Sequence, residues 1–201
     1  MREKSDAIGI FQKFYKMITI QFDAKVKVIR SHNGGEYFSG SLNMFLMDNG
    51  IIHESSCTAT PEQNSVVERK NRHLLEVAWS FLFARNVTKI HWADVVLVAT
   101  YLINWMPSKI HVNRAPLESL KGFFSIEYFP NSTPSKVFGL VAFVHIQAKS
   151  GSKLETRALK CLFVGYSPHQ KGYICYHTPT QNKYVSLNVT FFRDTGLFYW
   201  F

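Results

Sequence analysis

Two short segments carry the residue types that could do chemistry: residues 30–37 read R-S-H-N-G-G-E-Y, and residues 60–72 read T-P-E-Q-N-S-V-V-E-R-K-N-R. In the second segment, basic residues follow the acid Glu68. These are Arg69, Lys70 and Arg72. Carboxylates bind hard divalent cations, and basic side chains contact phosphates. The alternative is that Glu68 pairs with Arg72 at i,i+4 and that the basic residues form a solvated helix face.

The first segment combines a histidine with a turn. Asn33-Gly34-Gly35 predicts a tight turn, and Glu36 beside it could support a site without being part of it. His32 offers ring nitrogens, which suit softer metals such as zinc or copper better than magnesium. The alternative for His32 is a solvated surface histidine. Thirty-five residues lie between His32 and Glu68.

Together the two segments resemble the integrase of copia-type retrotransposons, a family of ribonuclease H-like polynucleotidyl transferases. In that family the segments read R-S-D-N-G-G-E-Y and T-P-x-Q-N-G-V-x-E-R-x-N. His32 matches the position of the second catalytic Asp, Glu68 matches the catalytic Glu, and the separation is the one that the family keeps. Ser65 stands where the family has Gly. Weaker likeness covers residues 5–194.

The resemblance implies in-line displacement at phosphorus, assisted by two Mg²⁺ or Mn²⁺ ions that two Asp and one Glu hold. This sequence departs from that pattern at His32. The family's first Asp lies on a strand upstream of the first helix, and because the first helix here begins near the start of the sequence, we expect that Asp to be absent. We expect Glu68 to be the remaining metal ligand in an incomplete site, no productive binding of Mg²⁺ or Mn²⁺, and no strand transfer. Losing several kcal/mol of metal assistance lowers a rate by at least about 10³-fold.

Residues 137–192 resemble the Src-homology-3-like barrel that follows the catalytic core in copia-type polyproteins. The clearest motifs are F-V-G-Y at residues 163–166 and K-G-Y at residues 171–173. Aromatic residues alternate here with basic residues that could contact DNA phosphates. The basic residues are Lys149, Lys153, Arg157 and Lys160. The alternative is a small aromatic core with scattered solvated lysines.

The hydrophobic pattern supplies the elements that would position these residues. It predicts helices over residues 11–22, 42–48, 64–85 and 92–105, strands near residues 26–29 and 51–52, and then four or five strands within residues 137–192. The fold class is therefore an α/β ribonuclease H-like core lacking its first strands, followed by a small all-β Src-homology-3-like barrel. The expected domains are a partial core (1–120), a linker (121–135), the barrel (136–195) and a tail (196–201). Without the family's first three strands, the core is expected to be marginally stable, to aggregate or to need a partner.

Composition narrows the function classes. The 201 residues are 46% hydrophobic, and 23 Lys and Arg against 14 Asp and Glu give a net charge of +9, which favours a nucleic-acid partner. The longest apolar run falls far below the roughly 20 residues of a membrane span. Three cysteines without C-x-x-C spacing predict buried, reduced thiols in an intracellular protein of the nucleus or cytoplasm. These are Cys57, Cys161 and Cys175.

The sequence thus predicts a truncated integrase core region that is catalytically inactive and binds DNA weakly, with strong salt dependence and little sequence preference. It could form homo-oligomers. One alternative is a non-enzymatic interaction protein that associates with an intact integrase by supplying or accepting strands. Another is an active nuclease whose missing acids come from Asp6 or Asp23.

Overall fold

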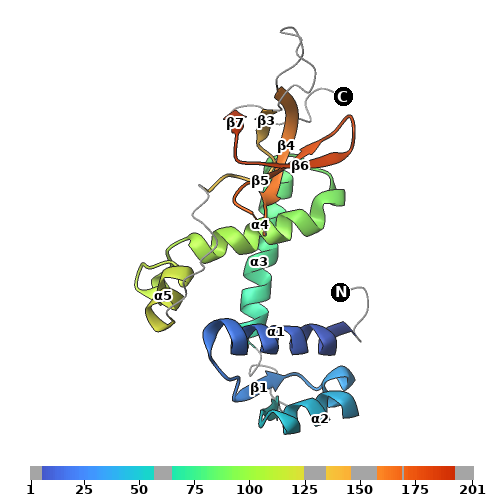
Figure 1. Cartoon of the computed structure of the whole chain (residues 1–201), viewed down its shortest axis with the longest axis vertical. Helices are drawn as coiled ribbons and strands as arrows, with labels where there is room; N and C mark the ends of the chain where they lie inside the picture. The colour runs from blue at the N-terminus through green and yellow to red at the C-terminus, as the bar shows by residue number, and fades with distance from the viewer. Residues whose placement is uncertain (1–5, 57–64, 125–134, 146–157, 169, 193–201) are drawn as a thin grey trace. The chain divides into compact units, whose positions relative to one another are not determined.

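The computed structural model describes residues 6–56, 65–124, 135–145, 158–168 and 170–192 (Figure 1). The chain divides into two compact units. The first comprises residues 1–71 with 121–126, and the second comprises residues 72–120 with 127–201.

The first unit alternates helices and strands. Its elements are α1 (Asp6–Phe22), β1 (Val28–Ser31), the 3-10 helix η1 (Gly35–Phe38), α2 (Gly40–Asp48) and β2 (Ile52–Ser55). β1 pairs with β2 in parallel, from Val28 opposite Ile52 to Ser31 opposite Ser55. Parallel pairing requires a crossover connection, which α2 supplies. The predicted α/β alternation is therefore confirmed, with β1 beginning two residues later than the pattern indicated.

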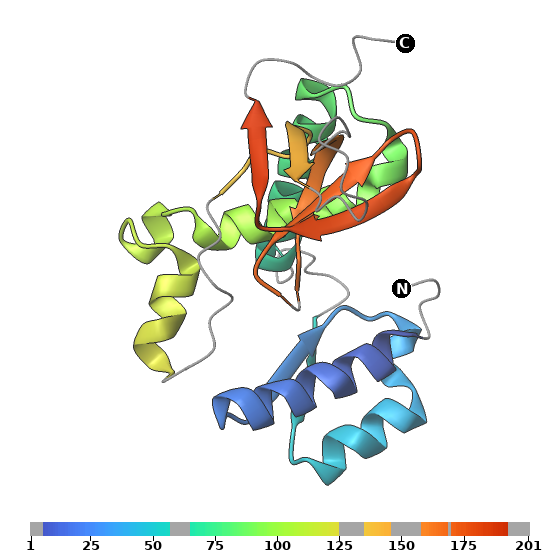
Figure 2. The same ribbon diagram turned by 45° about the horizontal axis from the view of Figure 1, so that its top comes forward.

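The core of the first unit is small. Leu42, Leu46 and Ile51 are its buried residues, and the ring of Phe45 meets those of Phe11 and Tyr15 edge to face, at centroid distances of 6.1 and 5.5 Å. Figure 2 shows α1 and α2 beside β1. No residue of α1 is fully buried, so this helix covers the core without being enclosed by it.

Three further helices follow, together with short 3-10 turns. They are α3 (Ser65–Ala84), η3 (Lys89–His91), α4 (Trp92–Trp105), η4 (Lys109–His111) and α5 (Pro116–Phe123). α4 ends ahead of Pro107, as predicted, because proline cannot continue a helix. The pattern did not predict α5, which continues into the segment expected to be a linker. No helix in the described ranges is long and apolar enough to cross a membrane.

Five antiparallel strands form the sheet of the second unit: β3 (Val141–His145), β4 (Ala158–Tyr166), β5 (Tyr173–His177), β6 (Asn182–Ser186) and β7 (Val189–Phe192). Their order is β6-β5-β4-β3-β7. Although two strands separate β5 from β7, the ring of Phe191 lies 4.8 Å from Tyr173 and 5.8 Å from Phe163. The sheet therefore curls around an enclosed aromatic core, which confirms the predicted small barrel. The five strands agree with the four or five predicted within residues 137–192.

α3 and α4 cover part of the outer face of this sheet, along β4 and β5 (Figure 2). Alternation along β4 directs Phe163 into the barrel and Leu162 and Val164 outward, against Val95 and Val98 of α4. Removing this outer apolar strip from water stabilises the fold, and the two helices bury it. The boundary between the two compact units therefore lies within α3, at residue 71. The expected division into a core, a linker, a barrel and a tail stays a prediction.

Candidate functional site

The parallel pairing of β1 and β2 positions the loop that carries His32. The backbone amide of Ser56 donates to the carbonyl of Ser31 at 3.0 Å, and the side-chain amide of Asn33 donates to the carbonyl of Ser56 at 2.8 Å. The Ser31 hydroxyl lies 2.8 Å from Nε2 of His53. These contacts fix the loop after β1 to the end of β2.

His32 lies at this loop with its side chain exposed. Its Nδ1 accepts a hydrogen bond from the backbone amide of Gly34 at 2.9 Å, and its ring meets Tyr37 edge to face at 5.1 Å. A ring nitrogen that accepts a hydrogen bond carries no proton, so this geometry assigns the neutral tautomer with hydrogen on Nε2. The lone pair of Nδ1 is engaged, and the ring brings no negative charge.

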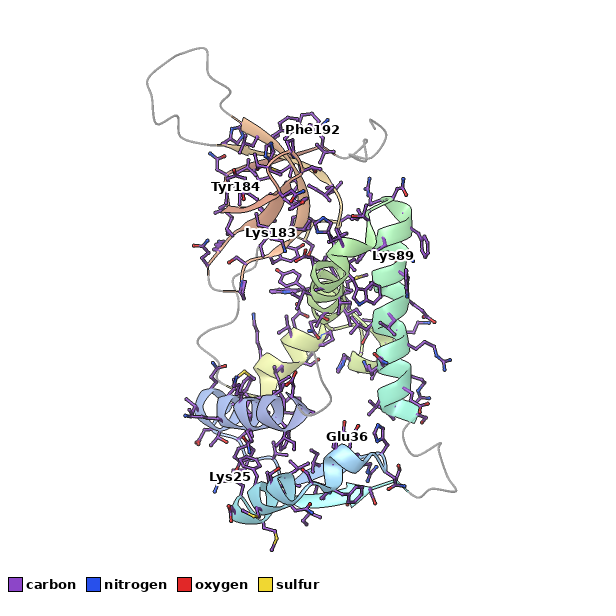
Figure 3. The ribbon with its side chains drawn as sticks, turned by 90° about the vertical axis from the view of Figure 1, so that its right-hand side faces the viewer. Lys25, Glu36, Lys89, Lys183, Tyr184 and Phe192 are labelled. Carbon is purple, nitrogen blue, oxygen red and sulfur yellow. The ribbon has the colours of Figure 1, made fainter. Side chains whose placement is uncertain are left out.

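Gly34 allows two side chains to lie close together. A Cβ atom at this position would lie 2.5 Å from Cε1 of His32 and 2.8 Å from the carboxyl group of Glu36. Glu36, labelled in Figure 3, is half-buried in η1 and is the single charged residue lining a pocket of 320 Å³. The other lining residues are Ala7, Ile8, Ile10, Phe11, Phe14, Ile29, Tyr37 and Leu42. One carboxylate among apolar side chains does not offset two dications.

Glu68 lies in the first turn of α3 and is exposed. The positive end of the helix dipole favours a carboxylate there. Among the described contacts, no ion pair joins Glu68 to Arg72. His32 and Glu68 belong to the same compact unit, and residues 57–64 between them lie outside the described residues. Their assignment to the family's catalytic positions stays a prediction.

No metal-binding group is assembled within the described ranges. No three His, Cys, Asp or Glu side chains there lie together as ligands. Asp6 is the first residue of α1, and Asp23 follows the last, in a left-handed conformation with φ 45°. Neither forms such a group with His32 or Glu68.

The predicted phosphate-contacting residues fall into two sets. Arg69, Lys70 and Arg72 are exposed on α3, and Lys160 is exposed on β4, where it pairs across the sheet with Phe143. Lys149, Lys153 and Arg157 lie outside the described residues. Contact of either set with nucleic acid stays a prediction.

The second unit contains a charged network that sequence reasoning missed. Lys183 of β6 donates to both carboxylate oxygens of Asp94 in α4, at 2.7 and 2.9 Å, and Nδ1 of the buried His91 lies 3.2 Å from Oδ2. Burial acts to raise the pKa of Asp94, but hydrogen bonds from His91 and Lys183 outweigh it and hold that pKa below the usual value. The network links a helix to a strand 89 positions away, and no local pattern encodes such a pairing.

Comparisons with known proteins agree with this architecture. A family model described as the retroviral polymerase SH3-like domain matches residues 140–199. The chain is 34% identical over 191 residues, 95% of its length, to the retrovirus-related Pol polyprotein from transposon RE2 of Arabidopsis thaliana, and 32% identical over 97% of its length to that from transposon TNT 1-94 of Nicotiana tabacum. It spans 13% and 14% of those two proteins.

Two solved structures also match. A chain of the simian T-cell lymphotropic virus intasome in complex with PP2A regulatory subunit B56 gamma has a TM-score of 0.49 at 16% identity, covering 85% of this chain and 57% of that one. The HTLV-2 integrase catalytic core domain in complex with magnesium (trimeric form) has a TM-score of 0.43 at 15% identity, covering 58% and 70%.

Proposed function

Because this chain belongs to the copia-type, retrovirus-related Pol polyproteins of transposons and corresponds to their integrase region, whose family role is DNA integration, we propose that it binds DNA without catalysing strand transfer. The chain spans about one-seventh of the length of the relatives. The proposal therefore concerns this region and not the whole polyprotein.

The state of His32 is the observation that carries the catalytic half of the proposal. Magnesium and manganese prefer oxygen donors with negative charge. At the position matched to the family's Asp, this chain has an imidazole ring, which carries no negative charge and whose Nδ1 accepts from the Gly34 amide. The residues present do not fit a pair of hard dications because, of the two positions matched to the family's Asp and Glu, Glu68 alone supplies a carboxylate.

Charge supports the DNA-binding half. Residues 135–192 carry seven basic residues and one acid, Glu155. The basic residues are Lys136, Lys149, Lys153, Arg157, Lys160, Lys171 and Lys183. A polyanion that binds such a set of basic residues releases its own counterions, whatever its sequence.

A salt titration tests DNA binding. For duplex DNA, log K falls with log[salt] by about 0.9 for each neutralised phosphate, so we expect a steep loss of affinity between about 50 and 200 mM salt. Arg72→Gln is expected to reduce that slope by about 0.9 if Arg72 contacts a phosphate. Arg72→Lys is the matched control because it keeps the charge, and so it keeps the slope. Affinity that is insensitive to salt would contradict the proposal.

Calorimetry with Mg²⁺ or Mn²⁺ tests the catalytic half. The unaltered chain is expected to bind no pair of ions, whereas His32→Asp restores an oxygen ligand and is expected to bind at least one ion more tightly than the unaltered chain. Binding of two ions with His32 in place, or Mg²⁺-dependent nicking of plasmid DNA that Glu68→Ala abolishes, would overturn the proposal.

One observation favours a second candidate, association with an intact integrase. Within the described residues β1 pairs with β2 alone, and Val28 and Ile52 are 45% and 62% exposed on the same face of this pair. Unpaired strand edges accept strands from other chains. Co-purification with a full-length homologue after nuclease treatment would support this candidate, and its loss on nuclease treatment would favour DNA as the link.

A further inference from the structure

The outer face of strands β7, β3 and β4 places aromatic and basic side chains in adjacent positions. Phe143 of β3 lies between Lys160 of β4 and Thr190 of β7. Phe192, at the end of β7, lies diagonally across, with its ring centroid 5.2 Å from that of Phe143 and its plane at 66°. Figure 3 labels Phe192 on this sheet. We name Phe143, Phe192 and Lys160 the aromatic platform.

The platform has an accessible ring that is already oriented. Phe192 is 53% exposed, whereas Phe143 is half-buried. The edge-to-face contact between them stabilises the orientation of the Phe192 ring and leaves much of that ring open to solvent. A ligand that stacks on Phe192 therefore loses little side-chain freedom when it binds.

The surroundings of the platform favour an anionic ligand with flat rings. β3, β4 and β7 contain no acidic residue, and Lys160 is exposed one strand away from Phe143. Beside Phe143 on this face lie two polar groups, His145 and Thr190, whose Nε2 and Oγ1 are 3.0 Å apart, while Phe192 lies opposite the buried Val141. One half-exposed phenylalanine among polar and basic groups is too small and too polar a surface for an apolar protein partner.

We propose that the aromatic platform binds unpaired nucleic acid, with a base stacked on Phe192 and a backbone phosphate on Lys160. The inference rests on the proposed DNA binding and adds a substrate class to it. Bases in a duplex stack on one another and hide their faces, so unpaired bases alone can stack on a protein ring. Electrostatic attraction by itself does not make this distinction.

Fluorescence anisotropy on the full chain, with a labelled oligothymidine strand and a duplex of equal length, tests the proposal. Stacking contributes about 1–3 kcal/mol per base, so Phe192→Leu is expected to weaken single-strand binding at least about fivefold. Duplex affinity and the salt slope are expected to stay unchanged. Phe192→Tyr keeps the ring and is expected to keep the affinity.

Two further variants separate stacking from charge and from general effects. Lys160→Gln is expected to reduce the single-strand salt slope by about 0.7, because it removes one phosphate contact. Phe123→Leu is the matched control, since Phe123 is 83% exposed on α5 and is not part of these strands, and it is expected to leave both affinities unchanged. Circular dichroism checks that each variant folds.

Single-strand affinity of Phe192→Leu equal to that of the unaltered protein would overturn the platform. An equal loss of duplex affinity would also overturn the platform. A change in the sedimentation coefficient without a change in affinity would do the same, because it would indicate that a second copy of the chain covers this face. A different result would contradict the proposed function: binding of duplex DNA by the unaltered chain with an affinity that does not depend on salt.

Discussion

A single glycine controls how His32 presents its ring. Gly34 has φ −70° and ψ 134°, a conformation open to alanine, so the requirement for glycine is one of space. The atoms that an alanine methyl group would displace, Cε1 of His32 and the carboxyl group of Glu36, belong to side chains that can rotate away.

Gly34→Ala is therefore expected to fold with a nearly unchanged melting temperature while displacing His32 from the Gly34 amide. Without that hydrogen bond the ring loses its preference for the Nε2–H tautomer. Imidazole nitrogen chemical shifts, measured by NMR before and after the substitution, report this change. Shifts identical to those of the unaltered chain would show that the hydrogen bond does not select the tautomer.

The buried thiols provide a second test at the residue scale. Burial raises the pKa of Cys161 to about 11, and burial with the neighbouring Cys161 raises that of Cys175 to about 12. The thiolate is the reactive form, so both cysteines are expected to resist iodoacetamide at pH 8 in the native protein and to react once it is unfolded. Peptide mass spectrometry distinguishes them from Cys57, and native-state labelling of Cys175 would contradict the packing.

Residue types and spacing predict which positions match the family's site. They do not predict which contacts the side chains at these positions form. The alignment of the two motifs with those of the family matched His32 to the position of an Asp and Glu68 to the position of the Glu. The hydrogen bond from Gly34 to His32 depends on backbone angles over three residues, and Glu36 lines a pocket because α1 packs above it. Neither follows from composition or periodicity. The same holds for the contact between the rings of Phe192 and Phe143, which lie diagonally across two paired strands.

At the scale of elements, the link between α4 and β6 depends on Asp94. Asp94→Asn removes the charge that accepts two hydrogen bonds from Lys183, and we expect it to lower the free energy of unfolding at pH 7 by about 1 kcal/mol, because Lys183 is half-exposed to solvent. Glu54→Gln is the matched control. It removes the ion pair between Arg30 and Glu54, whose side chains are 63% and 45% exposed, and is expected to change stability by less than about 0.5 kcal/mol.

The pH dependence of the Asp94 effect has a definite sign. A carboxyl group whose pKa is lowered in the folded state stabilises the fold above its ordinary value of 3.8, and this contribution is lost as the pH falls through the lowered value. The difference between Asp94→Asn and the unaltered chain is therefore expected to shrink in acid. Urea unfolding at pH 7 and below pH 3.8 measures it. A difference that grows in acid would assign the stability to another group.

Elements with strong periodicity were predictable, and those governed by local geometry were not. α3 and α4 were predicted within one residue of their observed ends because an apolar stripe and a proline define them. The break between β6 and β7 lies at Leu187 and Asn188, in a segment without glycine or proline, where the amide of Asn188 donates to the Ser186 hydroxyl at 3.0 Å. α5 begins at Pro116, where the Glu118 carboxylate accepts from the backbone amide of Ala115 at 3.2 Å, a capping contact within a short helix.

At the scale of the whole molecule, the sequence predicts a domain boundary after residue 120, which stays a prediction, and the compact units divide the chain at residue 71 and place residues 121–126 with the first unit. A change in composition along the chain indicates where turns and charged segments lie. The compact units depend instead on which apolar surfaces cover one another, and the outer strip of β4 is covered by helices that precede it in sequence. That pairing joins segments more than 60 residues apart and leaves no local signal.

The two units are expected to differ in stability because they bury unequal cores. In the first, Leu42, Leu46 and Ile51 are the buried apolar residues, and its sheet has two strands of four residues each. The second has two buried clusters and five paired strands. Two-stranded sheets with little buried area are marginal in water. Amides of β1 and β2 are therefore expected to exchange with deuterium sooner than those of β4 and β5, in hydrogen-exchange mass spectrometry at neutral pH. Added DNA is expected to slow exchange where it binds, so the experiment is run first without it. Equal protection of all four strands would show that the small core opens only when the whole chain unfolds.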